Sequence, residues 1–397
     1  MAHSPALIIG AGIAGPAAAM ALQKAGIGSV VYEAHATSAA GIGEFLTLAT
    51  NGVNALRTLG ADALAIAAGF PTDSVVLWSG TGKRLGASVV SMPSKDGTTG
   101  YTLKRSDLYT AMTAQAEGRG IRIEHGKRLV AAEPVSGGVR AQFADGSEAL
   151  GAILIGCDGV YSQVRRLIDP HAPAPKYAGL INLGGYVRGV DVNADPGTYH
   201  MIFGKRAFFG YAVAPDGEVW WFANVPQPAE PTRDALSAVS SDEWRRRLLA
   251  LFADDAGPAN HLIEATSHDL TPSTFHTMPR LPHWHSDRMI VIGDAAHAPS
   301  PSSGQGASLS IEDAVQLARC LRDHSDASQA FAAFEQTRRA RVEGIIQAAA
   351  RVNSNKAATG VARVLRDMML PLVLKLIANS KQQREIYGYH LEWDVPA

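Results

Sequence analysis

A glycine-rich turn near the start of the chain constrains the fold more than any other feature. The apolar run Ala6–Ile9 leads directly into the turn Gly10–Gly15, and a helical pattern follows over Ala14–Ala25. A second apolar run, Ser29–Tyr32, ends at Glu33. Strand, turn, helix, strand and acid in this order predict a βαβ unit of a parallel sheet, with a dinucleotide bound at the strand ends.

The glycines and the acid each have a physical reason to stand where they do. Gly10 permits the tight turn, Gly12 lets the backbone approach a pyrophosphate, and Gly15 allows close packing of helix on strand. A carboxylate at Glu33 accepts hydrogen bonds from ribose hydroxyls and repels a 2′-phosphate, which favours FAD or NAD over NADP. A glycine-rich turn without a ligand is the structural alternative. A further helix near Asn54–Ala68 completes this unit.

Along the rest of the chain, the sequence pattern changes twice, first to that of an antiparallel sheet and then back to alternating strands and helices. Short aromatic and β-branched runs predict an antiparallel sheet between about 178 and 226. These runs are Gly179–Val187, Tyr199–Phe203, Ala207–Val213 and Val219–Val225. After Pro282 the α/β pattern returns, with a strand at Met289–Ile292 and helices over about 308–322 and 327–353. We predict a discontinuous, Rossmann-like cofactor domain (residues 1–75, 100–175 and 280–345), an inserted antiparallel-sheet substrate domain (76–99 and 176–279) and C-terminal helices (346–397).

Composition narrows the classes of function. The chain has 397 residues, and 36 Lys and Arg face 37 Asp and Glu, so a formal net charge of -1 gives no reason for binding nucleic acid. Two cysteines, Cys157 and Cys320, are too few for a disulfide framework or a cysteine-rich metal site, which suits a reducing compartment. The start of the chain lacks a signal-peptide pattern, and the apolar stretch Met368–Ala378 is shorter than the roughly 20 residues that span a bilayer. We expect a cytoplasmic protein without stable membrane association, in which this stretch is an amphipathic helix packed on the body.

A second chemical motif lies near residue 294. The turn Gly293–His297 follows the last predicted strand and carries Asp294. Open α/β sheets bind ligands at the carboxyl ends of their strands, so Asp294 is a candidate binding residue, whereas we expect His297 only to fill a polar gap. The loop continues through Pro301 and Gly304–Gly306 to a helix whose free N–H groups suit the negative charge of a reduced flavin.

Two further segments are weaker signals. The turn Cys157–Gly159 follows another apolar run, and its plain interpretation is a turn with Cys157 as a buried small hydrophobic side chain. Ser106 is a good N-cap for a helix over Asp107–Glu117. Arg105 before it is either a solvated charge or a guanidinium that reaches phosphate oxygens.

In this order, the motifs resemble those of the group A flavoprotein monooxygenases, the class of aromatic-ring hydroxylases. Members share an N-terminal dinucleotide fingerprint, a middle Asp-Gly motif and a late Gly-Asp motif, which are here Gly10–Gly15, Asp158-Gly159 and Gly293-Asp294. The stretch from Gly293 to Gly306, followed by Glu312-Asp313-Ala314, is the most specific match, and the resemblance spans residues 6 to about 320. Because the chain lacks the extra C-terminal domain of longer members, it resembles the short subgroup.

The resemblance assigns a contact with FAD to each motif. It implies Glu33 on the adenosine ribose, Arg105 and Asp294 on the pyrophosphate–ribitol part, Pro301 and Gly304–Gly306 beside the isoalloxazine, and Asp158 in binding FAD and NAD(P)H. There is one departure: many members have a basic residue directly after the ribose acid, where this chain has Ala34 and then His35.

The implied activity is that of a single-component monooxygenase. NAD(P)H and O₂ would serve to hydroxylate or epoxidise a hydrophobic aromatic or polycyclic compound through a flavin C4a-hydroperoxide, so no side chain is assigned as catalytic. No second glycine fingerprint is present, so NAD(P)H would bind without a domain of its own. The alternatives are an FAD-dependent dehydrogenase or halogenase on the same scaffold, or a non-catalytic flavin-binding protein. Halogenase relatives carry a Trp-x-Trp-x-Ile-Pro motif, which Trp220-Trp221-Phe222 does not match.

One face of the predicted antiparallel sheet would line the substrate pocket. Side chains alternate between faces, so a register error of one residue exchanges them. One face carries Gly210, Ala212, Trp220 and Phe222, and the other carries Phe209, Tyr211, Trp221 and Ala223. We favour the first face, because its two small residues leave room for a ligand.

Overall fold

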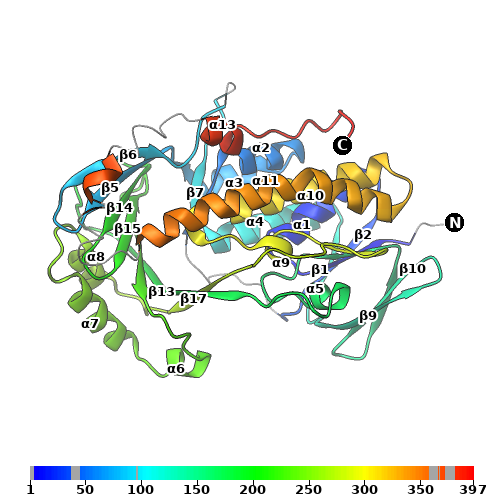
Figure 1. Cartoon of the computed structure of the whole chain (residues 1–397), viewed down its shortest axis with the longest axis horizontal. Coiled ribbons are helices and arrows are strands. Elements are labelled where there is room, and N and C mark those ends of the chain that lie inside the picture. The colour runs from blue at the N-terminus through cyan, green and yellow to red at the C-terminus, as the bar shows by residue number, and fades with distance from the viewer. Residues whose placement is uncertain (1–3, 37–44, 95–96, 357–364, 366, 372–380) are drawn as a thin grey trace.

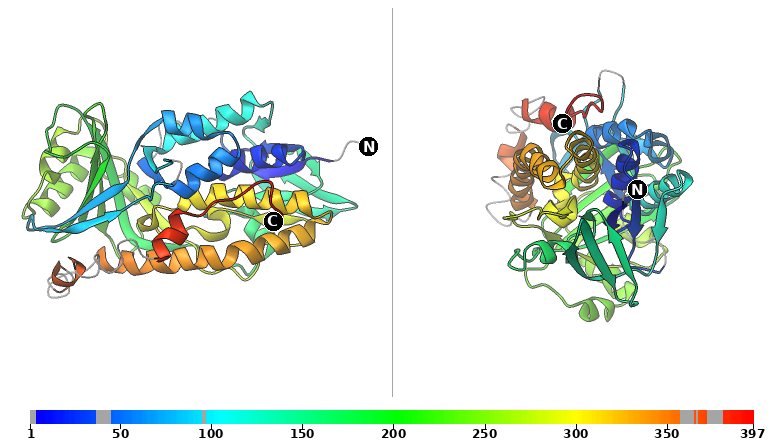
Figure 2. Two further views of the ribbon diagram at one scale, coloured as in Figure 1. Left: turned by 90° about the horizontal axis from the view of Figure 1, so that it is seen from above. Right: turned by 90° about the vertical axis from the view of Figure 1, so that its right-hand side faces the viewer.

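The computed structural model describes residues 4–36, 45–94, 97–356, 365, 367–371 and 381–397. Two regions lie side by side in Figure 1: a parallel sheet with helices on the right, and a large antiparallel sheet with short helices on the left. The long helix α11 (Ala327–Lys356) runs along both regions (Figure 1 and Figure 2).

Five parallel strands form the sheet of the first region, in the order β18-β12-β1-β2-β8. They are β1 (Ala6–Ile9), β2 (Ser29–Tyr32), β8 (Arg122–Glu124), β12 (Leu154–Gly156) and β18 (Met289–Val291). β1 and β2 match the predicted strands residue for residue. The predicted parallel sheet is confirmed, and its two strands beyond β1 come from segments near residues 155 and 290.

Helices pack against this sheet and against one another. α1 (Ala14–Lys24) contacts α4 (Arg105–Gly118) and α10 (Gly306–Asp323). α1 ends where Gly26 adopts a φ of 76° and the N–H of Ile27 donates to the carbonyl of Leu22 at 2.9 Å, a Schellman turn. The other helical elements are α2 (Thr50–Thr58), α3 (Asp62–Ala67), α5 (Gln163–Ile168), α9 (Asp294–His297), the 3₁₀ turn η1 (Pro301–Ser303) and α13 (Lys381–Tyr387).

The second region is built on a seven-stranded sheet in the order β17-β13-β16-β15-β14-β5-β6. Its strands are β5 (Ser74–Ser79), β6 (Arg84–Val89), β13 (Lys176–Val187), β14 (Thr198–Phe203), β15 (Phe208–Val213), β16 (Val219–Pro226) and β17 (Ser273–Thr277). All neighbours are antiparallel except β14 and β5. The predicted antiparallel sheet is confirmed. Three short helices accompany it: α6 (Arg233–Ser237), α7 (Ser241–Phe252) and α8 (Ala259–Ala265).

Two small antiparallel sheets complete the fold. The first comprises β9 (Leu129–Val135), β10 (Gly138–Phe143) and β11 (Glu148–Gly151), and Phe143 stacks on Tyr32 of β2 with ring centroids 4.7 Å apart. The second comprises β3 (Phe45–Leu48), β4 (Gly69–Pro71) and β7 (Tyr101–Lys104). Thr47 in this second sheet lies 3.0 Å from the hydroxyl of Tyr199 in β14, so the second sheet joins the two regions.

Two sequence predictions about helices were wrong in detail. The single helix expected near Asn54–Ala68 is two helices, α2 and α3, because Gly60 adopts a φ of 61° between them. Ser106 is not an N-cap: α4 begins at Arg105, its N-cap is Lys104, and the Ser106 hydroxyl donates instead to the Asp107 carboxylate at 3.1 Å.

The expected domain bounds stay a proposal. β5 crosses the expected boundary after residue 75, and α11 crosses the one after residue 345. The expected helix Met368–Ala378 lies largely outside the described residues; of its described part, Met368 and Met369 are more than half exposed, while Leu370 packs on the large sheet. In the described part of the chain, no helix is long and apolar enough to cross a membrane.

Candidate functional site

Three motifs that are far apart in the sequence meet at one edge of the parallel sheet. Because β18, β12 and β1 are consecutive parallel neighbours, the turns that follow them lie together. A Cβ atom built on Gly10 would lie 2.5 Å from the carbonyl oxygen of Cys157, so glycine is required where these turns touch. We name the edge formed by Gly10–Gly15, Glu33, Asp158 and Gly293–Gly306 the motif edge.

The glycine turn is tight and open toward solvent. Gly10 adopts a φ of 100°, and a Cβ on Gly15 would lie 1.9 Å from the Gly10 carbonyl oxygen. A Cβ on Gly12 would have no atom within 4 Å, so the backbone there is accessible to a ligand. No side chain caps the start of α1, whose N-cap is Ile13. This is the geometry that an anion-binding helix N-terminus needs.

Glu33 is buried at the end of β2, where it braces the turn. Its Oε2 accepts a hydrogen bond from the backbone N–H of Ala11 at 2.8 Å, and its Oε1 accepts one from the N–H of His35 at 2.9 Å. His35 therefore contributes through its backbone N–H, which any residue except proline supplies at this position. The carboxylate is fixed at the strand end that was expected to meet a ribose.

Asp294 and the loop beyond it form the other half of the motif edge. Asp294 is the first residue of α9, and its carboxylate makes no hydrogen bond or ion pair with any described residue. Its Oδ1 lies 3.8 Å from a Cβ built on Gly306, the first residue of α10. Gly304 adopts a φ of 59°, and no side chain caps α10. Pro301 is exposed at the start of η1.

Asp158 and Arg105 are placed differently. The Asp158 carboxylate accepts hydrogen bonds from the hydroxyl of Ser162, the N-cap residue of α5, at 2.5 Å and from the N–H groups of Gln163 at 2.7 Å and Val164 at 3.1 Å, so it pairs the first free N–H groups of α5. Burial raises its pKa, although these bonds oppose the shift. Arg105 is exposed at the start of α4. The contacts expected of both residues with FAD stay predictions.

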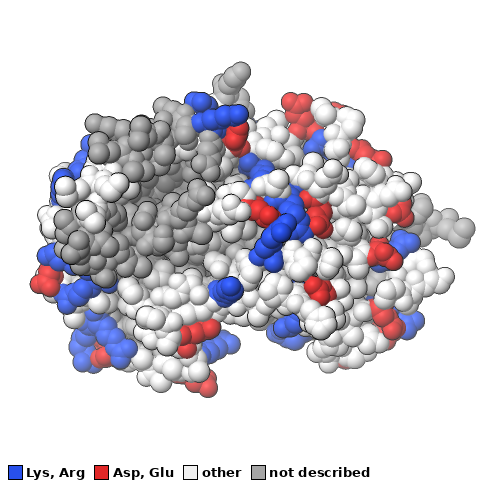
Figure 3. Space-filling model, viewed as in Figure 1, with Lys and Arg blue, Asp and Glu red and all other residues white. Residues whose placement is uncertain are grey.

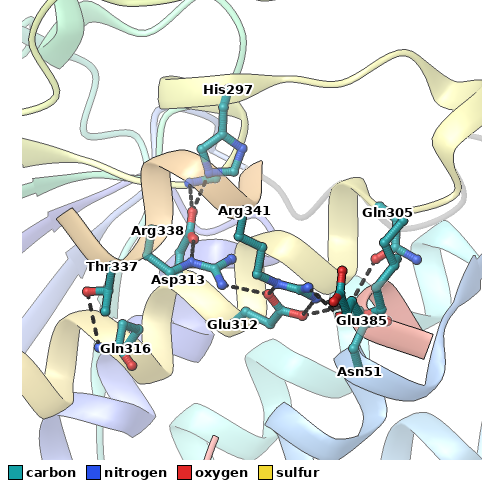
Figure 4. Close-up of polar contacts among 12 residues, drawn as sticks. Asn51, His297, Gln305, Glu312, Asp313, Gln316, Thr337, Arg338, Arg341 and Glu385 are labelled. Carbon is teal, nitrogen blue, oxygen red and sulfur yellow. Dashed lines mark hydrogen bonds and ion pairs between the residues drawn. The ribbon is translucent and has the colours of Figure 1, made fainter. Parts of the chain in front are cut away.

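Behind the motif edge lies a buried group of charged side chains (Figure 4). The Asp313 carboxylate accepts a hydrogen bond from the N–H of Gly293 at 3.0 Å and lies 2.5 Å from Nε2 of His297. His297 thus fills a polar gap, as expected. Asn51 of α2 donates to Oε1 of Gln305 at 2.9 Å and to Oε1 of Glu312 at 2.7 Å.

The large sheet turns two different faces to its surroundings. Phe209, Tyr211, Trp221 and Ala223 pack against α7 and α8 and form part of the core. The opposite side carries cross-strand rows of facing residues. One row is Tyr199, Ala212, Trp220 and Tyr186, and the next is Met201, Gly210, Phe222 and Gly184. We name this side the aromatic face; it includes the four residues favoured from the sequence, whose role in a pocket stays a prediction.

Phe45 of β3 lies against the aromatic face. Its ring centroid is 5.6 Å from that of Trp220, 5.8 Å from Phe222, 6.0 Å from Tyr199 and 6.5 Å from Tyr186. Since β3 belongs to the small sheet that joins the two regions, this ring lies between the large sheet and the region of the parallel sheet.

A pair of charged side chains lies at one edge of the aromatic face. The ammonium of Lys104 lies 4.2 Å from the ring centroid of Tyr186 and 5.3 Å from that of Trp220, and 3.3 Å from the Glu218 carboxylate. Glu218 also accepts a hydrogen bond from the indole N–H of Trp220 at 2.8 Å and pairs with the exposed Arg188. Lys104, which stacks on these rings, thus has an acidic partner.

The surface over α11 is charged, unlike the aromatic face. Figure 3 shows acidic and basic side chains interspersed on one face of the molecule and meeting over α11. A hollow of about 500 Å³ on this helix is lined by ion-paired side chains, among them Arg339 with Glu335 and Glu343. Such walls offer little apolar surface to a flat organic ligand.

The comparisons with known proteins agree with a cofactor site at the motif edge. A family model described as an FAD binding domain matches residues 3–349. FAD-dependent urate hydroxylase of Klebsiella pneumoniae is 30% identical over 86% of this chain and 87% of its own length, and 2-heptyl-3-hydroxy-4(1H)-quinolone synthase of Pseudomonas aeruginosa is 32% identical over 85% and 86%. Aurachin C monooxygenase/isomerase of Stigmatella aurantiaca is 29% identical over 87% and 88%. The crystal structure of Klebsiella pneumoniae HpxO complexed with FAD and uric acid superimposes with a TM-score of 0.85 at 26% identity, covering 98% and 96% of the two chains.

The chain belongs to the group A flavin monooxygenases. It is therefore an FAD-dependent monooxygenase.

The residues of this monooxygenase at the motif edge fit FAD. The open backbone at Gly12 and the uncapped starts of α1 and α10 suit phosphates and a negatively charged ring. The carboxylate oxygens of Asp294 accept no hydrogen bond from a described residue and can accept them from a ligand. Two buried polar atoms next to the α10 start, Oδ1 of Asn51 and Nε2 of Gln305, also lack a hydrogen-bond partner among the described residues. Buried polar groups are normally paired, so these atoms mark a place where a polar ligand belongs.

Sequence reasoning missed several residues around this site. Asn51, Phe45 and Lys104 give no signal in a single sequence, because only the tertiary fold brings them to the site. Glu312 and Asp313 did give one: two adjacent acids within an apolar helix need cations, and Arg338 and Arg341 stand three residues apart on the next helix.

Proposed function

We propose that this monooxygenase uses NAD(P)H and O₂ to hydroxylate a largely apolar, flat aromatic or polycyclic compound. The observation that carries the proposal is the aromatic face, where Tyr186, Tyr199, Trp220 and Phe222 surround the ring of Phe45. The substrate would lie between this face and FAD at the motif edge. Gly210 and Ala212 are the smallest residues in the central two strands of this face, and the ring of Phe222 lies over Gly210.

The proposed division of labour follows the chemistry of each residue. Glu33 binds the adenosine ribose, while Arg105 and Asp294 bind the pyrophosphate–ribitol part. FAD, when bound, supplies the redox chemistry that activates O₂. The start of α10, with the turn at Gly304–Gly306, stabilises negative charge on the reduced ring through its N–H groups. The aromatic face excludes water and orients the substrate.

The charges near the aromatic face support an apolar substrate. A small dicarboxylate needs a paired cationic clamp, but Lys104 is already paired with Glu218. Lys205 and Arg206 do not supply one either: the ammonium of Lys205 donates to the Asp254 carbonyl at 2.5 Å, and Arg206 pairs with the Asp254 carboxylate at 2.8 Å.

The names of the relatives point to two kinds of substrate. One relative is named a urate hydroxylase, for a small polar heterocycle, and another a 2-heptyl-3-hydroxy-4(1H)-quinolone synthase, for a flat bicycle with an alkyl chain. The second kind matches an apolar, aromatic wall better, because burial of rings and alkyl groups contributes about 25 cal/mol per Å².

A substrate panel tests the proposal. FAD-loaded protein is assayed for NADH and NADPH oxidation with 2-heptyl-4-quinolone, 2-naphthol, 4-hydroxybenzoate and urate under ¹⁸O₂, and products are weighed by mass spectrometry. We expect coupled ¹⁸O incorporation with the bicyclic compounds. Coupled turnover confined to urate or the benzoate refutes the substrate class. Oxidation of NAD(P)H without ¹⁸O in any product is uncoupled reduction of O₂ to H₂O₂, and it refutes hydroxylation of this class of compound.

A further inference from the structure

Two arginines of α11 hold two neighbouring acids of α10 in the protein interior (Figure 4). Arg338 places Nε 2.7 Å from Oδ1 of Asp313 and Nη1 2.7 Å from Oε2 of Glu312; the second contact is an ion pair rather than an aligned hydrogen bond. Arg341 donates to both oxygens of Glu312, at 3.0 and 2.8 Å. Arg338 and Asp313 are 0% exposed and Glu312 is 1% exposed.

The Asp313 arm of this network reaches the Gly-Asp turn. Its Oδ2 accepts the N–H of Gly293, which has a φ of 59°, and binds His297 at the other end of α9. Both ends of the segment that presents Asp294 are therefore attached to Asp313. Arg338 in turn holds the other oxygen of that carboxylate.

The Glu312 arm reaches the loop before α10. Its Oε1 accepts a hydrogen bond from Asn51, which also donates to Gln305, the N-cap residue of α10. Arg341, which holds Glu312, also donates to the carbonyl oxygens of Glu385 and Ile386 in α13, at 2.8 and 2.9 Å. This arm runs from the C-terminal helix to the loop expected beside the isoalloxazine.

The pKa values of Asp313 and Arg338 show that these two groups depend on each other. Burial alone would raise the pKa of Asp313, but the charges of His297 and Arg338 outweigh it and lower this pKa to about 2. Burial alone would lower the pKa of Arg338, but Asp313 and Glu312 outweigh it and raise it. Buried ion pairs are often no more stabilising than apolar side chains of the same volume, so stability alone does not explain this network. Fixed orientation of the two attached loops does.

We propose that Arg338 and Arg341 are positioning residues for FAD. Arg338 fixes the Gly293-Asp294 turn through Asp313, and Arg341 fixes the Gln305 loop through Glu312 and Asn51. The proposal rests on the assignment of FAD to the motif edge made above. Neither arginine is expected to touch the cofactor.

The variants R338M and R341M test this, with R339M as the matched control. Arg339 is the neighbouring residue on α11; it makes ion pairs with Glu335 and Glu343 and donates to the carbonyl of Leu281 at 2.8 Å, and none of these contacts involves Glu312 or Asp313. For each apo-protein the melting temperature is measured, and then the FAD dissociation constant by quenching of flavin fluorescence. We expect R338M to weaken FAD binding about tenfold or more relative to R339M, as for loss of a hydrogen bond to a charged group.

R341M has a different expected signature. FAD affinity changes less than in R338M, because the Gly293 turn keeps its support, but the visible absorption band of bound FAD shifts as the loop beside the ring relaxes. A shifted band in R338M with unchanged affinity, or an unchanged band in R341M, overturns the assignment of the two arms.

Two further variants keep the test decisive. R338K retains the positive charge but holds only one acid well, so it should fold where R338M fails, with FAD affinity between those of wild-type and R338M; wild-type affinity in R338K overturns the proposal. D294A tests the site itself. If D294A binds FAD like the wild-type, the assignment of the motif edge fails; if D294A weakens binding and R338M and R338K match R339M, only the positioning role fails.

Discussion

Asp294 and Asp158 are two carboxylates at neighbouring strand ends, and replacing each by alanine separates a role in binding FAD from a role in the fold. Asp294 makes no hydrogen bond or ion pair with a described residue, so its removal leaves no donor unpaired. The apo melting temperature of D294A should therefore stay within about 2 °C of wild-type, as for a substitution worth less than about 0.5 kcal/mol. Loss of a charge-assisted hydrogen bond to FAD costs about 1.5–3 kcal/mol, which weakens FAD binding roughly 10- to 150-fold.

D158A should behave in the opposite way. Asp158 accepts three hydrogen bonds at the start of α5, and loss of a helix cap costs about 0.5–2 kcal/mol. The apo-protein should melt several degrees lower, while FAD affinity falls less than in D294A. Differential scanning fluorimetry of the apo-proteins and titration with FAD measure both quantities. Wild-type FAD affinity in D294A, or a lower melting temperature in D294A than in D158A, would refute this reasoning.

Three further predictions concern the aromatic face, acid stability and the thiols. F45A should lower KM for the bulkiest aromatic compounds and raise it for small phenols, because the Phe45 ring fills the space between four aromatic side chains; a uniform rise in steady-state KM argues against a pocket there. The folded-state pKa of Asp313, about 2, lies below its unfolded value, so its contribution to stability is present above about pH 4 and is lost as pH falls toward 2. The difference in melting temperature between wild-type and D313N should therefore narrow over that range, and a constant difference contradicts this prediction. Burial raises the pKa of Cys157 and raises that of Cys320 to about 11, so a thiol reagent at neutral pH should label both only after unfolding; rapid labelling of the native protein contradicts this.

Local chemistry explains why some elements were predictable from the sequence. β1 and β2 are short, apolar and bounded by glycine or charge, so their limits were predicted residue for residue. The split between α2 and α3 was missed because a lone glycine inside a helical pattern is usually tolerated; only the φ of 61° at Gly60 shows the break. The cap of α4 was missed because Ser106 suits an N-cap chemically. The antiparallel pairing of β7 extends to Lys104, and the helix begins at the next residue, Arg105, before the predicted start at Asp107.

The features of the site also divide into those that local sequence patterns predict and those that depend on tertiary packing. The glycines and Asp294 follow strands, and neighbouring parallel strands end at one edge, so the sequence alone predicts that these motifs meet. Whether Arg338 and Arg341 contact Glu312 and Asp313 depends on how two helices pack, which no single-sequence pattern specifies. The aromatic face depends on register, and side-chain volume at Gly210 and Ala212 was the only available guide to it.

Two glycines of this chain are confined by different kinds of neighbour, and this difference predicts which of them controls substrate choice. A Cβ on Gly15 would lie 1.9 Å from a backbone oxygen of Gly10, which cannot move without rebuilding the turn. A Cβ on Gly210 would lie 2.5 Å from the ring of Phe222, which belongs to a side chain and not to the backbone. G15A should therefore lose FAD binding, while G210A should fold and bind FAD as the wild-type does.

In G210A the shifted Phe222 ring should reshape the aromatic face, so we expect the order of kcat/KM across the bicyclic and monocyclic substrates to change, with uncoupled NAD(P)H oxidation rising for the larger ones. A ring displaced from its rotamer costs about 0.5–1.5 kcal/mol, so the fold tolerates it. Steady-state kinetics with peroxide detection measure the effect, and A223S, on the opposite, core-packed face, is the control. If G210A leaves the order of substrates unchanged while FAD affinity falls, Gly210 serves the fold and the aromatic face does not bind the substrate. The backbone contacts at the motif edge leave no freedom of this kind.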